Sequence, residues 1–192
     1  MQRFGFIGTL FINTEPMEEM YYKPIPEFKK RIVMTWEEIR ELIDAGWGIG
    51  AHTHSHPNLS ELSTKDPSGS LTEHEMVKCD LMLNSKLGVT PLDFAFTGNS
   101  WSTIAETAAK KRYRFARLWI TGELYEADGH LLRYAELVKM PGKDEPDGGP
   151  PIEARYITAK TDPYRIPSME LQKLIYDYNK FRSYLEEAVL SS

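Results

Sequence analysis

The chain has 192 residues, of which 41% are hydrophobic and 27% charged, and its formal net charge is −5 at pH 7. This is an ordinary globular composition, and the length predicts one domain over residues 1–192. Acidic and basic residues are interspersed without a basic run, which excludes nucleic acid and an anionic membrane surface as main partners. Because Cys79 is the single cysteine, the fold contains no internal disulfide.

The sequence contains no apolar stretch near the roughly 20 residues of a membrane span. Its first residues lack the basic region, apolar core and cleavage site of a signal peptide. We therefore expect a cytoplasmic protein if the sequence is complete, and an envelope-associated or secreted one if an upstream segment is missing.

The first predicted elements are a strand, a helix and a second strand. Residues 8–12 form a short apolar run typical of a buried strand. Thr35 is expected to cap a helix over residues 36–45, with Glu38 completing a capping box. Residues 48–51 then predict a strand that leads directly into a group of histidines.

The middle of the chain predicts two more helices, each followed by a strand. Thr72 and Glu75 predict a capping box that opens a helix ending at Gly88. A strand is expected near residues 94–96 and a helix near residues 102–111. The next strand is expected over residues 115–120.

The last third predicts a loop, a strand and a helix. Residues 141–151 are rich in proline and glycine and predict a loop. Residues 154–159 predict a strand, and an amphipathic helix is expected from Ser168 to about Val189. Helices that alternate with short apolar strands predict an α/β fold with a mostly parallel, buried sheet. This pattern does not distinguish an open sheet from a barrel.

Three of the five histidines, His52, His54 and His56, directly follow a predicted strand. Imidazole is the commonest metal ligand in proteins, and sites in α/β folds form where strands end. On a continuing strand, His52 and His56 would lie roughly 13 Å apart, too far to share a metal. On a helical turn both could reach one ion at Zn–N distances of about 2.0–2.1 Å. Ser55 and Pro57 favour a turn and therefore the pair His52/His56; the alternative pair is His52/His54.

Other polar residues are not expected to join this group. His74 lies in the first turn of a predicted helix, where a solvated role is expected. His130 follows Asp128-Gly129, which is a hairpin-turn signal, and is expected to be exposed. Asp44 is expected on the solvent side of a helix end and Asp66 in a loop.

The sequence around the histidines resembles a known family. Residues 34–59, with the core His-Thr-His-Ser-His-Pro at 52–57, resemble the polysaccharide deacetylases that share the NodB homology domain, the carbohydrate esterase family 4 type. Their second motif is H-[ST]-x-x-H-P, usually preceded by a helix and a Gly-x-x-Ile-Gly strand. Residues 3–12 look like the family's second strand, and residues 94–98 resemble its third motif.

The resemblance implies a distorted (β/α) barrel that removes N-acetyl or O-acetyl groups from a carbohydrate. In this family two histidines and an aspartate hold a divalent metal, which lowers the pKa of its bound water. Zinc is expected, and cobalt, nickel or iron would also suit such ligands. Carried over, His52 and His56 are the metal ligands, while Thr53 and Ser55 steady the loop and the imidazole tautomers. His54 has no family role and is expected to face away or line the rim.

Three departures from the family pattern stand out. The family's first motif, Thr-Phe-Asp-Asp, supplies the aspartate ligand and the catalytic base, and it is expected before Phe4. The family's last motif contains the general-acid histidine and is expected after Val189. Neither is present in the sequence, and Thr97-Gly98 stands where the third motif has Arg-Pro-Pro-Tyr-Gly. We therefore expect a barrel incomplete at its first strand and a chain inactive as it stands. The strand at residues 9–12 would then leave an apolar sheet edge, covered by a missing segment or paired in a homo-oligomer.

Three functions remain open at this point. The first is a metal-dependent carbohydrate deacetylase, and the second is a non-catalytic relative that binds carbohydrate or serves assembly. The third is another metallohydrolase that uses His52 and His54. The candidate residues for substrate contact are Thr97, Gly98 and Trp101, and the further aromatic candidates for stacking on sugar rings are Tyr21, Tyr22 and Trp119.

Overall fold

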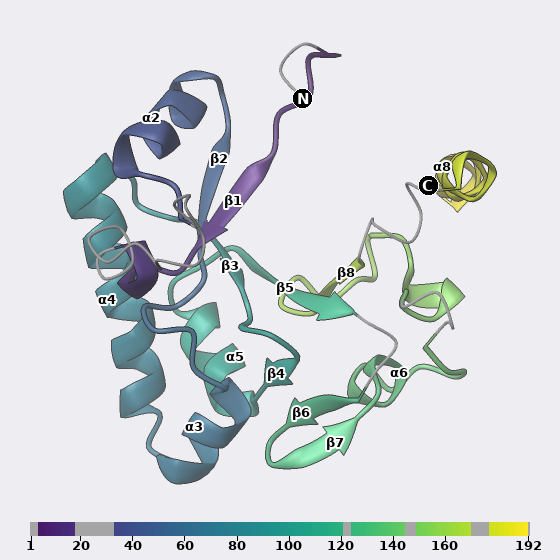
Figure 1. Ribbon diagram of the computed structural model, residues 1–192. Helices are drawn as coiled ribbons and strands as arrows, with labels where there is room; N and C mark the ends of the chain where they lie inside the picture. Colours follow the sequence, from purple (N-terminus) through teal and green to yellow (C-terminus); the bar gives the residue numbers. More distant parts are fainter. Residues whose placement is uncertain (1–3, 18–32, 121–123, 145–148, 170–176, 192) are drawn as a thin grey trace, which may run out of the picture.

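A computed structural model of the chain describes residues 4–17, 33–120, 124–144, 149–169 and 177–191 (Figure 1). Short strands alternate with helices along most of this length. The strands are β1 (Thr9–Ile12), β2 (Gly48–Ala51), β3 (Asp93–Ala95), β4 (Ser100–Trp101), β5 (Phe115–Ile120), β6 (Tyr125–Ala127), β7 (His130–Leu132) and β8 (Ile166–Met169). The helices are α2 (Trp36–Asp44), α3 (Leu59–Lys65), α4 (Ser70–Leu87), α5 (Thr103–Lys110), α6 (Tyr134–Leu137), the 3-10 turn η2 (Ile152–Ala154) and α8 (Tyr178–Ser191).

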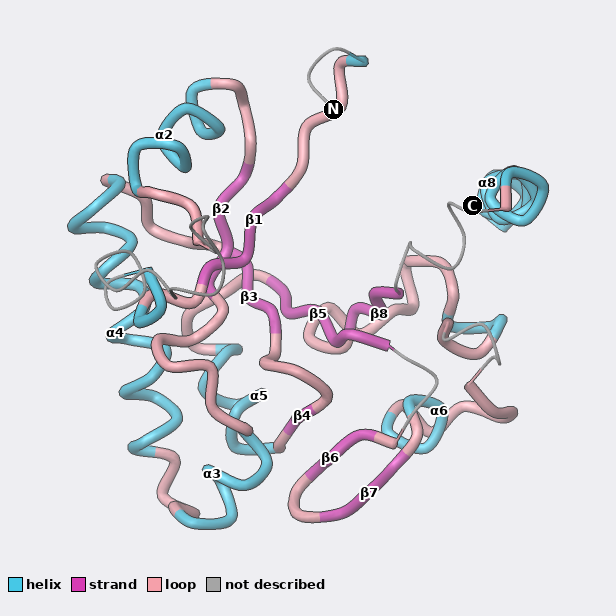
Figure 2. The backbone as a smooth tube through the Cα atoms, in the orientation of Figure 1, coloured by secondary structure: helices cyan, strands magenta, loops and turns pink. Residues whose placement is uncertain are grey.

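The main sheet has five strands in the order β1-β2-β3-β5-β8, and every neighbouring pair is parallel. A smaller sheet contains β4, β6 and β7 (Figures 1 and 2). The predicted α/β class with a parallel sheet is confirmed. In the described part of the chain the main sheet stays open, with β1 and β8 at its edges.

Helices α2, α4 and α5 lie together on one side of the main sheet (Figure 1). The sheet residues that face them are fully buried, among them Ala51, Phe94 and Leu118. On α4, Met76 and Leu83 are equally buried, and they belong to the same apolar cluster. This layer fixes the orientation of each strand, so the next residue along a strand faces the opposite side.

Several predicted boundaries are confirmed. Thr35 and Glu38 form the predicted capping box at the start of α2. Gly88 ends α4 in the left-handed conformation, with φ of 71°. The hairpin between β6 and β7 turns at Asp128 and Gly129, whose φ angles are 49° and 77°.

Three predictions of secondary structure are wrong. Helix α4 begins at Ser70, two residues before the predicted cap Thr72, and Asp66 accepts a hydrogen bond from the Leu71 backbone in its first turn; Thr72 and Glu75 do not cap it. Residues 154–159 form no strand, and the strand that extends the sheet is β8. Ser168 lies in that strand, so the helix predicted from Ser168 is replaced by α8, which begins later.

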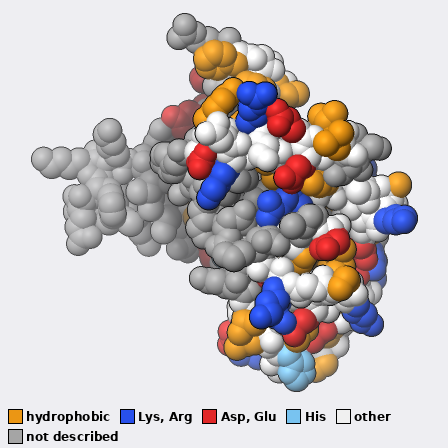
Figure 3. All heavy atoms as spheres, turned by 90° about the vertical axis from the view of Figure 1, so that its right-hand side faces the viewer, with side chains coloured by type: hydrophobic (Ala, Val, Ile, Leu, Met, Phe, Trp, Pro, Cys, Tyr) orange, Lys and Arg blue, Asp and Glu red, His pale blue; other side chains and the backbone are white. Residues whose placement is uncertain are grey.

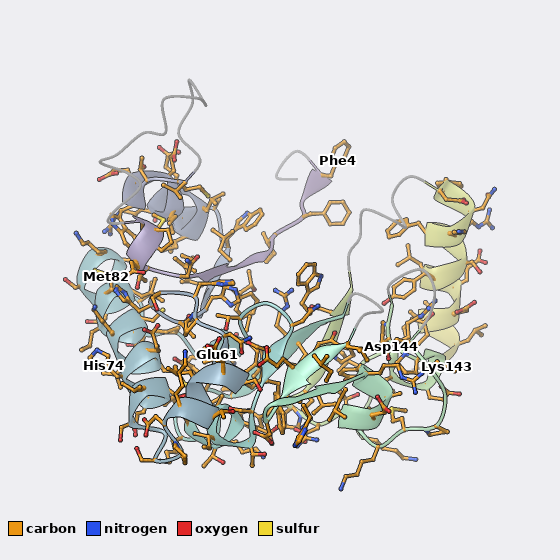
Figure 4. All side chains as sticks on the ribbon, turned by 60° about the horizontal axis from the view of Figure 1, so that its bottom comes forward. Phe4, Glu61, His74, Met82, Lys143 and Asp144 are labelled. Atoms are coloured by element: carbon orange, nitrogen blue, oxygen red, sulfur yellow. The ribbon has the colours of Figure 1, made fainter. Side chains whose placement is uncertain are left out.

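Surface residues follow the sequence expectation in part. His74 and His130 are exposed, and Figure 4 shows His74 on the outer side of α4. Phe4 and Phe6, next to edge strand β1, are 74% and 64% exposed. Figure 3 shows hydrophobic side chains near this N-terminal segment, with charges of both signs scattered over the rest of that face. In the described part of the chain, no helix combines the length and apolar character needed to cross a bilayer.

Candidate metal site and adjoining cavity

The chain turns sharply where β2 ends, and this turn brings two histidine rings together. Thr53 and His56 both adopt left-handed backbone conformations, with φ of 62° and 59°. That conformation is costly for residues other than glycine, especially for a β-branched one, and such strain concentrates at functional sites. As a result the rings of His52 and His56 lie 4.8 Å apart between centroids, at an interplanar angle of 76°. This is the i, i+4 arrangement that the turn signals predict.

The ring of His52 has a defined orientation. Its Nδ1 lies 2.8 Å from the carbonyl oxygen of Ala95 in β3. Since a carbonyl only accepts hydrogen bonds, Nδ1 carries the proton and Nε2 keeps its lone pair for a metal. Burial, the largest cause, lowers the pKa of His52 to about 4, which keeps the imidazole neutral near pH 7.

His54 takes part in a different set of contacts. Its Nδ1 lies 2.8 Å from Thr14 Oγ1, and its Nε2 lies 3.8 Å from Glu15 Oε1. The residue is 6% exposed, so it is buried and does not line a rim. The fold therefore places the ring of His52 against that of His56, and not against that of His54 as in the alternative pair.

Glu75 on α4 holds the loop between the two candidate ligands. Its Oε2 accepts the backbone N–H of His54 at 3.0 Å and that of Ser55 at 2.8 Å. Its Oε1 accepts the Ser55 hydroxyl at 2.9 Å. Sequence reasoning assigned Glu75 to a helix cap and missed this contact, for which no local sequence signal exists.

Thr53 and Ser55, the two predicted supporting residues, act on the backbone of the loop. The Thr53 hydroxyl accepts the N–H of His56 at 3.1 Å, and Ser55 contacts Glu75. In the described part of the chain, the tautomer of His52 is set by Ala95 of β3 and not by Thr53 or Ser55.

The chemistry of the two histidines fits part of a metal site. A neutral imidazole with a free Nε2 is a suitable ligand for zinc and for other borderline divalent ions. Within the described residues, no group of three His, Cys, Asp or Glu side chains could hold a metal ion. The described chain therefore offers the pair His52 and His56, and no third protein ligand is assigned.

A cavity of about 350 Å³ adjoins His56. Its lining includes Asn58, Thr97, Gly98, Asn99, Ser100 and Glu126. Two predicted substrate residues, Thr97 and Gly98, thus lie beside His56. Trp101, the third, is not in the lining: it is 5% exposed, and its indole N–H donates to Glu106 at 3.0 Å. Tyr21 and Tyr22 lie outside the described residues.

Glu126 on β6 adds a carboxylate to this cavity. The side-chain NH₂ of Asn58 donates to it, while the side-chain oxygen Oδ1 of Asn58 accepts the N–H of Glu61 and so caps α3. Sequence reasoning missed Glu126, because only the hairpin fold brings β6 beside the end of the histidine loop. The hairpin signal at Asp128-Gly129 was the one clue to its position.

Comparison with known proteins agrees with the fold. The model of the family described as polysaccharide deacetylase matches residues 1–116. No curated protein matches the chain. Among solved structures, deacetylase PplD of Streptococcus pyogenes in complex with acetate is 16% identical, with a TM-score of 0.50 over 69% of this chain and 54% of that one.

Two further solved structures are similar at the same level. IcaB from Ammonifex degensii is 14% identical, with a TM-score of 0.50 over 61% of this chain and 50% of that chain. The BpsB deacetylase domain from Bordetella bronchiseptica is 12% identical, with a TM-score of 0.50 over 61% and 55%. At these identities the likeness shows a shared fold. The chain spans about half the length of these structures.

Proposed function

Because this chain belongs to the polysaccharide deacetylase family, we propose that it acts in a metal-dependent hydrolase that removes acetyl groups from a carbohydrate. The family and the fold support deacetylation of a carbohydrate in general. Metal dependence and the particular residues named below are part of the proposal.

The pair His52/His56 is the observation that carries this proposal. Two imidazoles 4.8 Å apart, on a strained loop at the end of a parallel strand, have a spacing suited to one shared ion. The hydrogen bond from His52 Nδ1 to Ala95 leaves Nε2 ready as a ligand. A packing role does not explain why the chain accepts two left-handed residues at this position.

Each neighbouring residue has a separate task in the proposed site. A divalent cation held by His52 and His56 would supply Lewis acidity, which polarises an acyl carbonyl and lowers the pKa of water. Glu75 fixes the loop, so the two rings keep their separation without a cost in ordering when an ion binds. Zinc is the expected ion, with cobalt, nickel or iron as alternatives.

The cavity beside His56 is the proposed position of the sugar. Its lining offers backbone and side-chain hydrogen-bonding groups at Thr97, Gly98 and Asn99. Glu126 provides a carboxylate that can accept hydroxyl groups of a sugar ring. A cavity of about 350 Å³ is large enough for one sugar residue, within the range typical of small-molecule sites.

Zinc titration by calorimetry, with metal content measured by mass spectrometry, tests the site. We expect His52→Ala and His56→Ala each to abolish stoichiometric binding. The matched control is His130→Ala, which removes an exposed imidazole and should leave binding unchanged. Undiminished metal content in both site variants would reject the proposal. A loss of binding in His54→Ala with normal folding would favour the other metallohydrolase reading.

An assay of acetate release from N-acetylated oligosaccharides tests the activity separately. Release that depends on added metal and on His52 supports a deacetylase. Saturable oligosaccharide binding without release would instead favour a non-catalytic carbohydrate-binding protein.

A further inference from the structure

Arg117 on β5 places a cation on the face of the sheet opposite the helices. Its neighbours Ala116 and Leu118 are fully buried toward the helices, so alternation along the strand turns Arg117 to the other face. The guanidinium is half-buried there. Its Nε and Nη2 donate to Ser168 Oγ at 3.1 Å and 2.9 Å, and Ser168 in turn donates to the Leu118 carbonyl.

The acceptor of Arg117 is therefore a neutral hydroxyl. Within the described residues Arg117 makes no ion pair, whereas Arg112, Arg114 and Arg165 pair with Asp80, Asp93 and Glu106. The ring of Phe11 lies 5.3 Å from the guanidinium carbon and shields one of its faces from water. A half-buried charge without a counter-ion is costly, so an anion that meets it gains more than it would at the surface.

Arg117 lies beside the candidate metal ligands. In the sheet register it is paired with Ala95, the residue whose carbonyl accepts a hydrogen bond from His52. Phe11, which contacts Arg117, lies over Gly50, where an added Cβ would come within 2.5 Å of its ring. Gly50 and His52 are two residues apart and share a face of the chain. The guanidinium and the imidazole thus lie on the same side of the sheet.

We propose that Arg117 is the receptor for a carboxylate on a ligand bound at this face, next to His52 and His56. Two of its five N–H groups are used by Ser168, and the remaining edge, with Nη1, has the planar geometry that a carboxylate matches with two hydrogen bonds. The carboxylate belongs either to free acetate or to an acidic sugar residue. The choice between these two sources rests on the proposed function, whereas carboxylate binding by Arg117 does not.

The test follows the arginine Nε–Hε resonances by NMR, at constant ionic strength, on protein from which metal has been removed by a chelator that is then dialysed away. Sodium acetate is compared with acetamide, and D-glucuronate with D-glucose. We expect the carboxylates, but not their neutral analogues, to shift the Arg117 resonance with saturation. Arg117→Gln should abolish this binding, and Arg117→Lys should weaken it about tenfold because the bidentate geometry is lost.

Arg112 provides the matched control, because its guanidinium already pairs with Asp80 at 3.2 Å. Its resonance should not move, and Arg112→Gln should retain carboxylate binding. Saturation by acetate alone assigns the site to the free acid, and saturation by glucuronate assigns it to an acidic sugar. Equal shifts with neutral analogues, or carboxylate binding unchanged in a folded Arg117→Gln variant, would overturn the proposal. A protein that releases no acetate but binds carboxylate at Arg117 would contradict only the proposed deacetylation.

Discussion

Ser55 and Glu75 are joined by two hydrogen bonds, from the Ser55 backbone N–H at 2.8 Å and from its hydroxyl at 2.9 Å. A third bond, from the N–H of His54, reaches the same carboxylate. Helix α4 therefore holds the loop that separates His52 from His56. The distance between the two rings depends on a residue 20 positions along the chain from Ser55.

Replacing Glu75 with alanine should loosen this loop. Three charge-assisted hydrogen bonds are lost, and we expect zinc affinity to fall about 10–100-fold, the usual cost of removing an outer partner of a metal site. The free energy of unfolding should fall by roughly 1–3 kcal/mol, since two backbone N–H groups lose their acceptor. Calorimetric zinc titration and urea denaturation measure the two effects.

Glu73→Ala is the matched control for that variant, because Glu73 lies on the same helix and has the same charge. Zinc affinity should be unchanged in it. Equal losses of affinity in both variants would indicate a general charge effect and contradict the role of Glu75.

Thr53→Val should destabilise the turn between the two histidines. The substitution keeps the shape of a fully buried side chain but removes the hydroxyl that accepts the N–H of His56 at 3.1 Å. We expect the free energy of unfolding to fall by about 1–2 kcal/mol. Urea denaturation followed by circular dichroism measures it, and Thr53→Ser, which retains the hydroxyl, should lose clearly less. A valine variant as stable as the wild type would show that the bond contributes nothing to the turn.

Features that depend on neighbouring residues could be predicted from the sequence. The capping box of Thr35 and Glu38, the strand Phe115–Ile120 and the pairing of His52 with His56 through a turn all follow from spacing within a few residues. The local pattern is enough to predict them, because the capping box, the apolar run and the i, i+4 spacing of the histidines each lie within a span of at most six residues.

The rest of the site depends on contacts between distant segments. Glu75 was assigned to a helix cap, yet Asp66 and the left-handed Gly69 begin that helix, which frees Glu75 to meet the histidine loop. Residues 154–159 alternate like a strand, but Ile157 is 67% exposed and the sheet instead takes Ile166–Met169 next to β5. In both cases contacts between segments distant in the sequence determine the structure, and no local sequence pattern predicts such contacts.

Stability should decline at alkaline pH because of Cys79. Burial raises the pKa of this thiol to about 12 from its ordinary value of 9.0. Above pH 9 the unfolded chain loses this proton while the folded chain keeps it, so the free energy of unfolding falls as pH rises toward 12. The slope from one such group is at most about 1.4 kcal/mol per pH unit. Urea denaturation at several pH values measures this slope.

Cys79→Ala should reduce the slope of stability against pH. Part of the slope should remain above pH 10, because burial also raises the pKa of the Tyr113 hydroxyl. The native thiol should also resist alkylation by iodoacetamide at pH 8 and react once urea is added, because the thiolate is the reactive form. Rapid alkylation of the folded protein would contradict the buried position of Cys79.

Glu106 on α5 links the helix layer to the segment that leads into β8, and its loss should be more damaging than that of a surface acid. Its carboxylate is 7% exposed and accepts hydrogen bonds from Arg165 at 2.8 Å and from Lys110 at 2.6 Å. Burial opposes ionisation, but these two cations hold the pKa of Glu106 below its usual value. Glu106→Gln leaves Arg165 with the more distant carboxylate of Asp162, at 3.9 Å, and we expect a loss of roughly 2–4 kcal/mol, reduced by the partial exposure of both cations. The control is Glu61→Gln, which breaks an exposed i,i+4 ion pair; urea denaturation should show a loss of unfolding free energy below about 0.5 kcal/mol. Similar losses in the two variants would mean that Glu106 does not anchor β8.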